Sequence, residues 1–244
     1  IEQDDKVKAF INTQDLKDAE YVNSHYVVMA TKKGQIKKTS LEKYSRPRIN
    51  GINAITIKEN DELLEAKLTN GNSEILMAVK SGKAIRFEES KTRPMGRSAS
   101  GVRGIRLKDD KDEVIGMVSV NDVSTDMLVV SKNGYGKRSS LEDYRITNRG
   151  GKGVKTISIT EKTGSLVAIK NVSDENDLMI INKSGIAIRM SVEKLRVMGR
   201  ATQGVKLINL KGEDTIAAVA KVIKEDESDE DSQEISPQNE GLSI

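Results

Sequence analysis

Basic residues recur in this sequence at fixed distances from a glycine, and this spacing limits the chemistry that they can do. The four glycines are Gly34, Gly82, Gly134 and Gly185, at successive separations of 48, 52 and 51 residues. A lysine precedes each of them by two residues, and a lysine or arginine follows each by four. In the last three repeats, arginines also follow at 11 and 15 residues. Cations at regular intervals are suited to neutralising the regularly spaced phosphates of a nucleic acid.

The candidate DNA-binding residues are the lysines and arginines at or next to these repeated positions. They are Lys32, Lys33, Lys37, Lys38, Arg46, Arg48, Lys80, Lys83, Arg86, Arg93, Arg97, Arg103, Lys132, Lys137, Arg138, Arg145, Arg149, Lys152, Lys155, Lys183, Arg189, Arg196, Arg200 and Lys206. A single charged side chain is most often simply solvated, but repetition in register predicts a basic stripe around one rim. Aromatic residues, which would stack on unpaired bases, make up only 3% of the sequence, so a duplex is favoured over a single strand.

Other kinds of site are disfavoured by the residues themselves. Residues 150–153 look like part of a nucleotide-binding loop, but the Lys-Ser/Thr of the Walker pattern is missing and a strand pattern follows instead of a helix. His25 is the only histidine and the chain has no cysteine, so no metal site is expected. Asp109, Asp110 and Asp112 lie in a charged turn, where we expect solvation and not acid–base chemistry. We therefore assign no catalytic residue.

Short strands and tight turns must position these cations. A second glycine follows each anchor, after 17 residues in the first repeat and 19 in the others, and it precedes an alternating apolar pattern: INAITI, VRGIRL, VKTISI and VKLINL. A further alternating stretch closes each repeat, beginning at Leu63, Val114, Leu166 and Ile216. Each repeat thus predicts four short strands and two tight turns, with the anchor glycines where positive φ is needed. No window keeps the apolar spacing of a helix.

Four-stranded units repeated about a centre predict an all-β, propeller-like fold, because one unit alone cannot bury both faces of its sheet. The units are predicted at residues 23–72, 73–122, 123–174 and 175–223. Residues 1–22 are expected to end a preceding blade, with residues 6–13 as its closing strand and residues 17–20 as a loop. Residues 224–244 show no periodicity and are expected to form a disordered acidic tail.

The charge is divided unevenly along the chain. The 244 residues include 40 lysines and arginines and 37 aspartates and glutamates, for a net charge of +3. Residues 224–244 hold one lysine and eight acids, which leaves 39 basic and 29 acidic residues and a net charge of +10 in the rest. A basic body with an acidic tail indicates a polyanionic partner and a competitor for it. The absence of cysteine fits a reducing cytoplasm, and no apolar run is long enough to span a membrane.

The repeats resemble the blades of a known family. The stretches that carry the resemblance are SKNGYGKRSSLEDYRITNRGGKGVKTISIT, AIRFEESKTRPMGRSASGVRGIRL and AIRMSVEKLRVMGRATQGVKLINL. They are similar to the C-terminal domain of DNA gyrase A, a β-pinwheel, over roughly residues 5–223. The acidic residues 225–231 also look like that family's tail.

The sequence departs from the family pattern at one motif. Gyrase carries a box heptapeptide, Gln-Arg-Arg-Gly-Gly-Lys-Gly, in its first blade, and family pinwheels usually have six blades. The nearest stretch here resembles a degenerate copy in a later blade: Thr147, Asn148, Arg149, Gly150, Gly151, Lys152 and Gly153. We expect the first blades, with any true box, to lie upstream of Ile1.

The resemblance implies a non-catalytic domain that bends and wraps duplex DNA around its basic rim, largely independently of sequence. Its partners would be duplex DNA and, in the parent heterotetramer, the rest of gyrase A and the gyrase B protein. The parent would be a cytoplasmic, nucleoid-associated type IIA topoisomerase, an isomerase that uses ATP and magnesium for negative supercoiling. The fragment itself is expected to need no cofactor and to have no membrane partner.

Two alternatives remain open at this point. The chain could be the corresponding domain of topoisomerase IV, which selects DNA geometry, or a protein-interaction propeller with an acidic partner. An enzyme is disfavoured, since no acid, base or metal ligands converge. We also expect residues 225–231 to compete with DNA for the rim because their charge is opposite.

Overall fold

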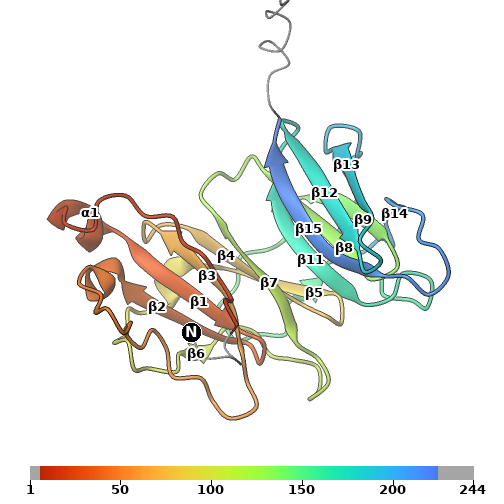
Figure 1. Cartoon of the computed structure of the whole chain (residues 1–244). Coiled ribbons are helices and arrows are strands. Elements are labelled where there is room, and N and C mark those ends of the chain that lie inside the picture. Colours follow the sequence, from red (N-terminus) through yellow and green to blue (C-terminus); the bar gives the residue numbers. More distant parts are fainter. Residues whose placement is uncertain (1–5, 225–244) are drawn as a thin grey trace, which may run out of the picture.

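The computed structural model describes residues 6–224 and consists of antiparallel β-sheets that follow one another along the chain (Figure 1). The first sheet has the order β3-β1-β2-β6, with bounds Leu63–Thr69, Tyr26–Thr31, Gln35–Ser40 and Val102–Arg103. The second has the order β10-β5-β4-β7, with bounds Val154–Lys155, Lys83–Glu88, Glu74–Val79 and Val114–Val120. The predicted all-β class is therefore confirmed, and the predicted acidic tail beyond Lys224 lies outside the described residues.

The other two sheets continue the series. The third has the order β11-β8-β9-β14, with bounds Leu166–Val172, Asp126–Ser131, Tyr135–Ser140 and Val205–Lys206. The fourth has three strands in the order β13-β12-β15, with bounds Ala187–Ser191, Asn176–Asn182 and Ile216–Ile223. Short 3-10 turns follow β2, β5 and β9, at Leu41–Tyr44, Glu89–Lys91 and Leu141–Asp143.

The outermost strand of each of the first three sheets comes from the next unit along the chain. Val102 pairs with Ile36, and Val154 pairs with Ala84; Val205 of β14 pairs with β9 in the same way. The prediction that each unit supplies all four strands of its own sheet is therefore wrong for this strand. Residues 52–57 of the first unit form no strand, and the fourth sheet keeps three strands within the described part of the chain.

The anchor glycines adopt the predicted left-handed conformation, with φ between 81° and 88°. They also allow a close approach to the strand of the next unit: a Cβ at Gly34 would lie 2.8 Å from the carbonyl oxygen of Ile105. The same carbonyl-to-turn contact recurs at Gly82, where a Cβ would lie 2.9 Å from the oxygen of Ile157. Any side chain there would therefore be strained and would also separate two units.

The hydrophobic core is divided among the spaces between consecutive sheets. On β4, Ile75 and Met77 belong to a cluster shared with the first sheet, while Leu76 and Ala78 belong to a cluster shared with the third. Period-two alternation therefore buries both faces of a middle sheet. The long strands β3, β7, β11 and β15 lie next to one another (Figure 1), and a Cβ at Gly116 would be 2.9 Å from Cγ2 of Ile169.

One α-helix covers the face of the first sheet that has no neighbouring sheet. This helix, α1 (Ala19–Ser24), is capped by Asp18, whose side chain accepts from the N–H groups of Glu20 and Tyr21. Tyr21 and Val22 are buried against that sheet. The predicted loop at residues 17–20 is thus partly helical, and residues 6–13, expected to be a strand, have no assigned secondary structure. Six residues are too few for a visible helical period.

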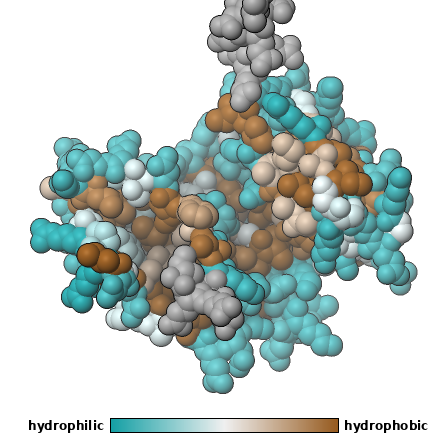
Figure 2. Space-filling model, viewed as in Figure 1, coloured by the Kyte–Doolittle hydropathy of each residue, from teal (hydrophilic) through white to brown (hydrophobic). Residues whose placement is uncertain are grey.

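Hydrophilic residues occupy the periphery of the molecule, whereas hydrophobic residues gather nearer its centre and over β15 (Figure 2). No helix in residues 6–224 has the length and hydropathy that a membrane span needs.

Candidate nucleic-acid interface

The outer edge of the first three sheets is built by a loop and a short strand of the following unit. We call this edge the rim; its loops are residues 93–97, 145–149 and 196–200, and its strands are β6, β10 and β14. Each loop is fixed by a backbone hydrogen bond to the preceding sheet: Met95 N to Lys38 O at 2.8 Å, Thr147 N to Arg86 O at 2.9 Å and Met198 N to Arg138 O at 2.9 Å. The rim is therefore part of the sheets themselves.

Further backbone hydrogen bonds join the rim of one unit to that of the next. Arg106 N donates to Gly151 O at 2.8 Å, and Gly150 N donates to Gly104 O at 2.6 Å. The same junction recurs further along, where Ser158 N donates to Thr202 O at 3.0 Å. Residues 147–153, the degenerate box, thus lie at the junction of the second and third units and form part of a continuous surface.

The arginines at offset 15 hold this surface together through their side chains. Arg149 donates from Nε to Lys91 O at 2.9 Å and from a guanidinium nitrogen to Arg103 O at 3.1 Å. Arg200 donates to Lys155 O at 2.8 Å. Both side chains are half-buried, so their charges are held at fixed positions on the rim.

Most of the predicted cations on the rim and turns are exposed and available to a ligand. They are Lys33, Arg46, Arg48, Arg93, Arg103, Lys132, Arg145, Lys152, Lys155, Lys183, Arg196 and Lys206, while Lys83 and Arg97 are half-buried. Lys155 pairs directly with Lys83 across the outer edge of the second sheet. Like charges at directly opposed positions are destabilising, so this edge favours the binding of an anion.

Several cations gather around surface clefts. A cleft of about 470 Å³ is lined by Arg48, Asn53 and Arg97 at the first junction, and one of about 230 Å³ is lined by Arg145 and Lys152 at the second. A third, of about 530 Å³, is lined by basic and acidic residues, among them Lys132, Lys162, Lys206, Glu213 and Asp214. Each is open and polar, as a groove for a backbone of phosphates would be.

Five predicted DNA contacts are instead buried between units: Lys37, Lys38, Arg86, Lys137 and Arg138. Arg86 forms an ion pair with Glu74 at 2.5 Å and donates to the carbonyl oxygens of Leu141 and Tyr144 at 2.8 and 3.0 Å. Such a group has no free donor surface for a phosphate. The prediction that these five bind DNA is therefore wrong.

The buried cations at offset 4 share one partner position. Each contacts a residue eight positions before its anchor glycine. The pairs are Lys38 with Tyr26, Arg86 with Glu74, Arg138 with Asp126 and Arg189 with Asp177. Lys38 also pairs with Glu89 of the next unit at 2.7 Å, and Arg138 with Asp174. An acid at that offset in three of the four repeats was the sequence signal for a structural ion pair, and it was missed.

Lys37 and Lys137 hold the rim loops from inside. Lys37 donates to Ala54 O at 2.6 Å and to Arg97 O, and Lys137 donates to Gly199 O at 2.6 Å. Burial, reinforced by the nearby charge of Arg97, lowers the pKa of Lys37 to about 8. Burial likewise lowers the pKa of Lys137 to about 8. These ammonium groups are connectors within the protein.

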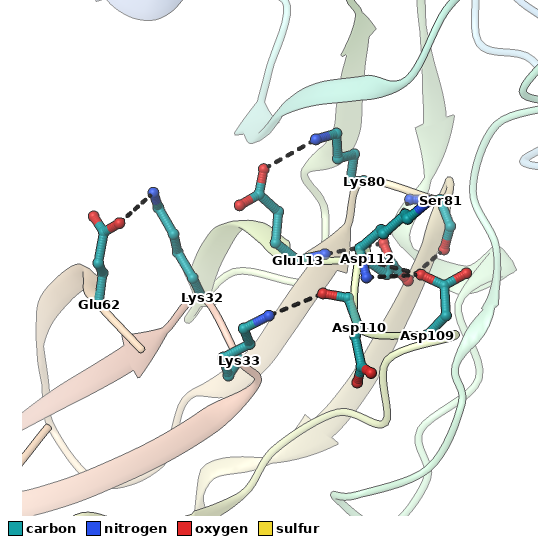
Figure 3. Close-up of polar contacts among 10 residues, drawn as sticks. Lys32, Lys33, Glu62, Lys80, Ser81, Asp109, Asp110, Asp112 and Glu113 are labelled. Carbon is teal, nitrogen blue, oxygen red and sulfur yellow. Dashed lines mark hydrogen bonds and ion pairs between the residues drawn. The ribbon is translucent and has the colours of Figure 1, made fainter. Parts of the chain in front are cut away.

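The lysines that precede the first two turns are paired with acids (Figure 3). Lys32 contacts Glu62 at 3.2 Å and Lys80 contacts Glu113 at 3.3 Å. Hydrogen bonds from Lys8 and Lys32 lower the pKa of Glu62 to about 2. Lys33 donates to the carbonyl oxygen of Asp110 at 3.0 Å.

The two later turns lack these acids. Gly164 and Thr215 occupy the positions that correspond to Glu62 and Glu113, so Lys132 and Lys183 carry more available charge than their earlier counterparts. Arg189 is exposed but pairs with Asp177 at 2.7 Å.

Two further cations line the clefts but do not recur at a fixed offset, so repetition could not reveal them. Lys43 lines a cleft with Arg46, Arg48 and Arg97, and the ammonium of Lys162 lies 5.4 Å from the ring centre of Tyr135. Among the described residues, no group of three or more histidine, cysteine, aspartate or glutamate side chains could hold a metal ion.

Comparison with known proteins shows the same repeat. The family model described as "DNA gyrase C-terminal domain, beta-propeller" matches residues 25–70, 73–121, 125–173 and 176–223. DNA gyrase A of Staphylococcus aureus strain NCTC 8325 is 43% identical over 243 residues, which cover 98% of this chain and 27% of that protein. The DNA gyrase A of Staphylococcus epidermidis is also 43% identical, over 93% of this chain and 25% of the relative. The chain thus spans about a quarter of the length of these relatives.

Solved structures agree on the fold. A DNA gyrase A C-terminal domain matches with a TM-score of 0.79 and 24% identity, over 91% of this chain and 72% of that one. The C-terminal domain of a DNA topoisomerase IV matches with a TM-score of 0.77 and 21% identity, over 82% of this chain and 62% of that one. The sheets are those of a β-pinwheel, and the chain belongs to the family of DNA gyrase A C-terminal domains.

Proposed function

We propose that this chain binds duplex DNA along its rim and bends the duplex around the row of sheets. The observation that carries the proposal is the registered placement of cations on the outer edges of three consecutive sheets, whose loops are joined by backbone hydrogen bonds. Membership of a DNA gyrase family supports the same function. Arg103, Lys155 and Lys206, which occupy equivalent strand positions, are the contacts that we assign first.

Several contacts are needed because bending a duplex is unfavourable. Bending a site of 20–30 base pairs by 40–90° costs on the order of 1–6 kcal/mol. A surface that continues from unit to unit can offset this with many phosphate contacts, whereas one patch of charge cannot. Contacts to phosphate carry no direct sequence information, so we expect binding to depend on how easily the DNA bends and little on its sequence.

In the whole protein, this domain would present bent DNA to the parts of a type IIA topoisomerase that cut and rejoin strands. The chain would contribute no catalytic residue and would need no cofactor of its own. ATP, magnesium, the rest of gyrase A, the gyrase B protein and a cytoplasmic location would belong to that assembly. The structural likeness to topoisomerase IV supports a second candidate, in which the same rim selects DNA geometry.

Titration of a short duplex against this chain at increasing salt tests the proposal. We expect log K to fall linearly with log[salt], with a slope of about −0.9 for each phosphate neutralised. If the rim instead serves an acidic protein, the chain shows no appreciable affinity for duplex DNA even at low salt, and the proposal fails.

A further inference from the structure

The rim carries one exposed apolar residue in each unit, and each directly follows an arginine. The four pairs are Arg48 with Ile49, Arg93 with Pro94, Arg145 with Ile146 and Arg196 with Val197. Ile146 and Val197 each expose 49% of their surface, and Ile49 exposes all of it. Pro94 is exposed as well. A large apolar group thus stands beside a cation at the same place in every repeat.

Three of these apolar residues are fixed by the sheet beside them. Pro94, Ile146 and Val197 each form a parallel β-bridge with the offset-4 cation of the preceding unit. The next residue in each loop donates its N–H to the carbonyl of that same cation. The apolar side chains therefore occupy defined positions on the outer edge and cannot easily turn inward.

An isolated exposed apolar residue is common on protein surfaces and needs no function. Repetition makes the difference here, because nothing in solvent favours isoleucine, proline or valine over a polar residue at one registered position. The half-exposed surface of Ile146 and Val197 remains in water in the described structure, so packing against the preceding sheet accounts for only part of each side chain.

Arginine beside an exposed apolar group suits one region of duplex DNA. Proteins that bend DNA from the minor groove place arginines in the groove, where the negative potential is strongest, and insert apolar side chains between base steps. The inserted group partly unstacks the bases and kinks the duplex, which is least unfavourable at flexible pyrimidine–purine steps. Proline, isoleucine and leucine-sized groups are the kinds of side chain that act in this way.

We propose that Ile49, Pro94, Ile146 and Val197 are apolar wedges that enter the minor groove of bound duplex DNA and localise its bending at flexible base steps. This inference rests on the proposed DNA binding and deepens it. Phosphate contacts would supply most of the affinity, and the wedges would decide where along the DNA each unit settles.

The test separates the two kinds of contact. In Ile146→Ser with Val197→Ser, both wedges are shortened and no charge is changed; in Arg145→Gln with Arg196→Gln, the charges are removed and the wedges remain. Each protein is mixed with a short duplex that carries end-attached fluorophores for bending and a 2-aminopurine at a central TA step for unstacking. Circular dichroism melting checks that each variant is folded before the comparison.

We expect the wild-type chain to raise 2-aminopurine fluorescence and to bend the duplex. The serine variant should lose most of both signals while its salt slope stays unchanged, with affinity lowered by no more than about tenfold because phosphate contacts dominate. The glutamine variant should lower the salt slope by about 0.9 for each phosphate that is no longer neutralised.

Two outcomes would overturn the inference without touching the proposed function. One is a wild-type chain that binds and bends the duplex with no increase in 2-aminopurine fluorescence, and the other is a serine variant whose bending and fluorescence match those of the wild type. A wild-type chain that does not bind duplex DNA at low salt would overturn the proposed function and the wedges with it.

Discussion

The guanidinium of Arg149 donates a hydrogen bond to the backbone carbonyl of Arg103, 46 residues earlier in the chain, at 3.1 Å. Arg200 makes the equivalent bond to Lys155, one unit further on. One arginine therefore positions the strand that carries the next exposed cation, and the arrangement repeats along the rim. Since a guanidinium has five N–H donors, Arg149 keeps donors for a phosphate while it performs this structural role.

The exposed strand cations should set the salt dependence of DNA binding. Changing Arg103, Lys155 and Lys206 to Gln removes three charges from equivalent rim positions. If each contacts one phosphate, the slope of log K against log[salt] should become shallower by about 0.9 per substitution. Fluorescence anisotropy with a labelled duplex measures this slope.

A matched control lies away from the rim on β15. Lys221→Gln removes one exposed charge there and should leave the slope unchanged. An equal effect of Lys221→Gln and Lys155→Gln would show that net charge matters and the rim does not.

Arg86 should be essential for stability and not for direct contact with DNA. Arg86→Met leaves the carboxylate of Glu74, which is largely buried, without its ion pair. Breaking a buried pair in this way destabilises a protein by about 3–5 kcal/mol, which a urea unfolding curve would show as a lower midpoint.

The exposed pair of Lys80 and Glu113 provides the comparison. Lys80→Met should change stability by less than about 1 kcal/mol, because solvent screens an exposed pair. A loss of stability as small in Arg86→Met would contradict the structural role that we assign to Arg86.

The repeat was readable from the sequence because its determinants are local. A glycine that needs positive φ, such as Gly134, and alternating strands on either side leave a visible mark within a few residues. The exchange of the outer strand leaves no such mark. Val154 and Lys155 would look the same whether they paired with their own unit or with β5, because the choice depends on contacts about 70 residues apart in sequence.

The candidate site was predictable only in part for a related reason. Arg86 and Arg145 recur with equal regularity, yet one is buried in an ion pair and the other is exposed. Regular spacing reports that a position is constrained, and it does not distinguish a constraint from packing from one due to a ligand. The acid at Glu74 is the feature that separates the two cases, because a buried cation needs a partner.

Close packing of β7 against β11 should make Gly116 intolerant of a side chain. In Gly116→Ala, the new methyl would lie 2.9 Å from Cγ2 of Ile169, and overpacking of this kind costs about 1–3 kcal/mol. Thermal unfolding followed by circular dichroism would show a lower Tm. Gly96→Ala is the control, since a Cβ there meets no atom within 4 Å, and an equal fall in Tm for both variants would argue against tight strand packing.

The acidic residues 225–231 lie outside the described residues, and their prediction rests on charge alone. Removal of residues 225–244 takes away all eight acids of the tail and leaves the basic body unchanged. We expect tighter binding of duplex DNA at low salt and a smaller difference at high salt, because screening weakens competition between charges. Equal affinities of the full and shortened chains at every salt concentration would rule competition out.

The buried ammonium of Lys137 should make stability rise with pH over a limited window. Its pKa is lowered to about 8 in the folded chain, against an ordinary value of 10.5. Between these values the unfolded chain holds more protons than the folded one, so the free energy of unfolding increases as pH rises.

Lys137→Ile offers a test because the second and fourth units carry Ile85 and Ile188 at the same offset, so the fold accommodates that side chain there. The difference in unfolding free energy between the wild type and Lys137→Ile should grow in favour of the wild type from pH 7.5 to 9.5, in urea titrations at each pH. The range stops at 9.5 because the pKa of Tyr144, raised to about 12 by burial, makes stability fall once tyrosines of the unfolded chain ionise near pH 10. A difference that does not change with pH would mean that Lys137 titrates normally, with its ammonium hydrated and not enclosed between two units.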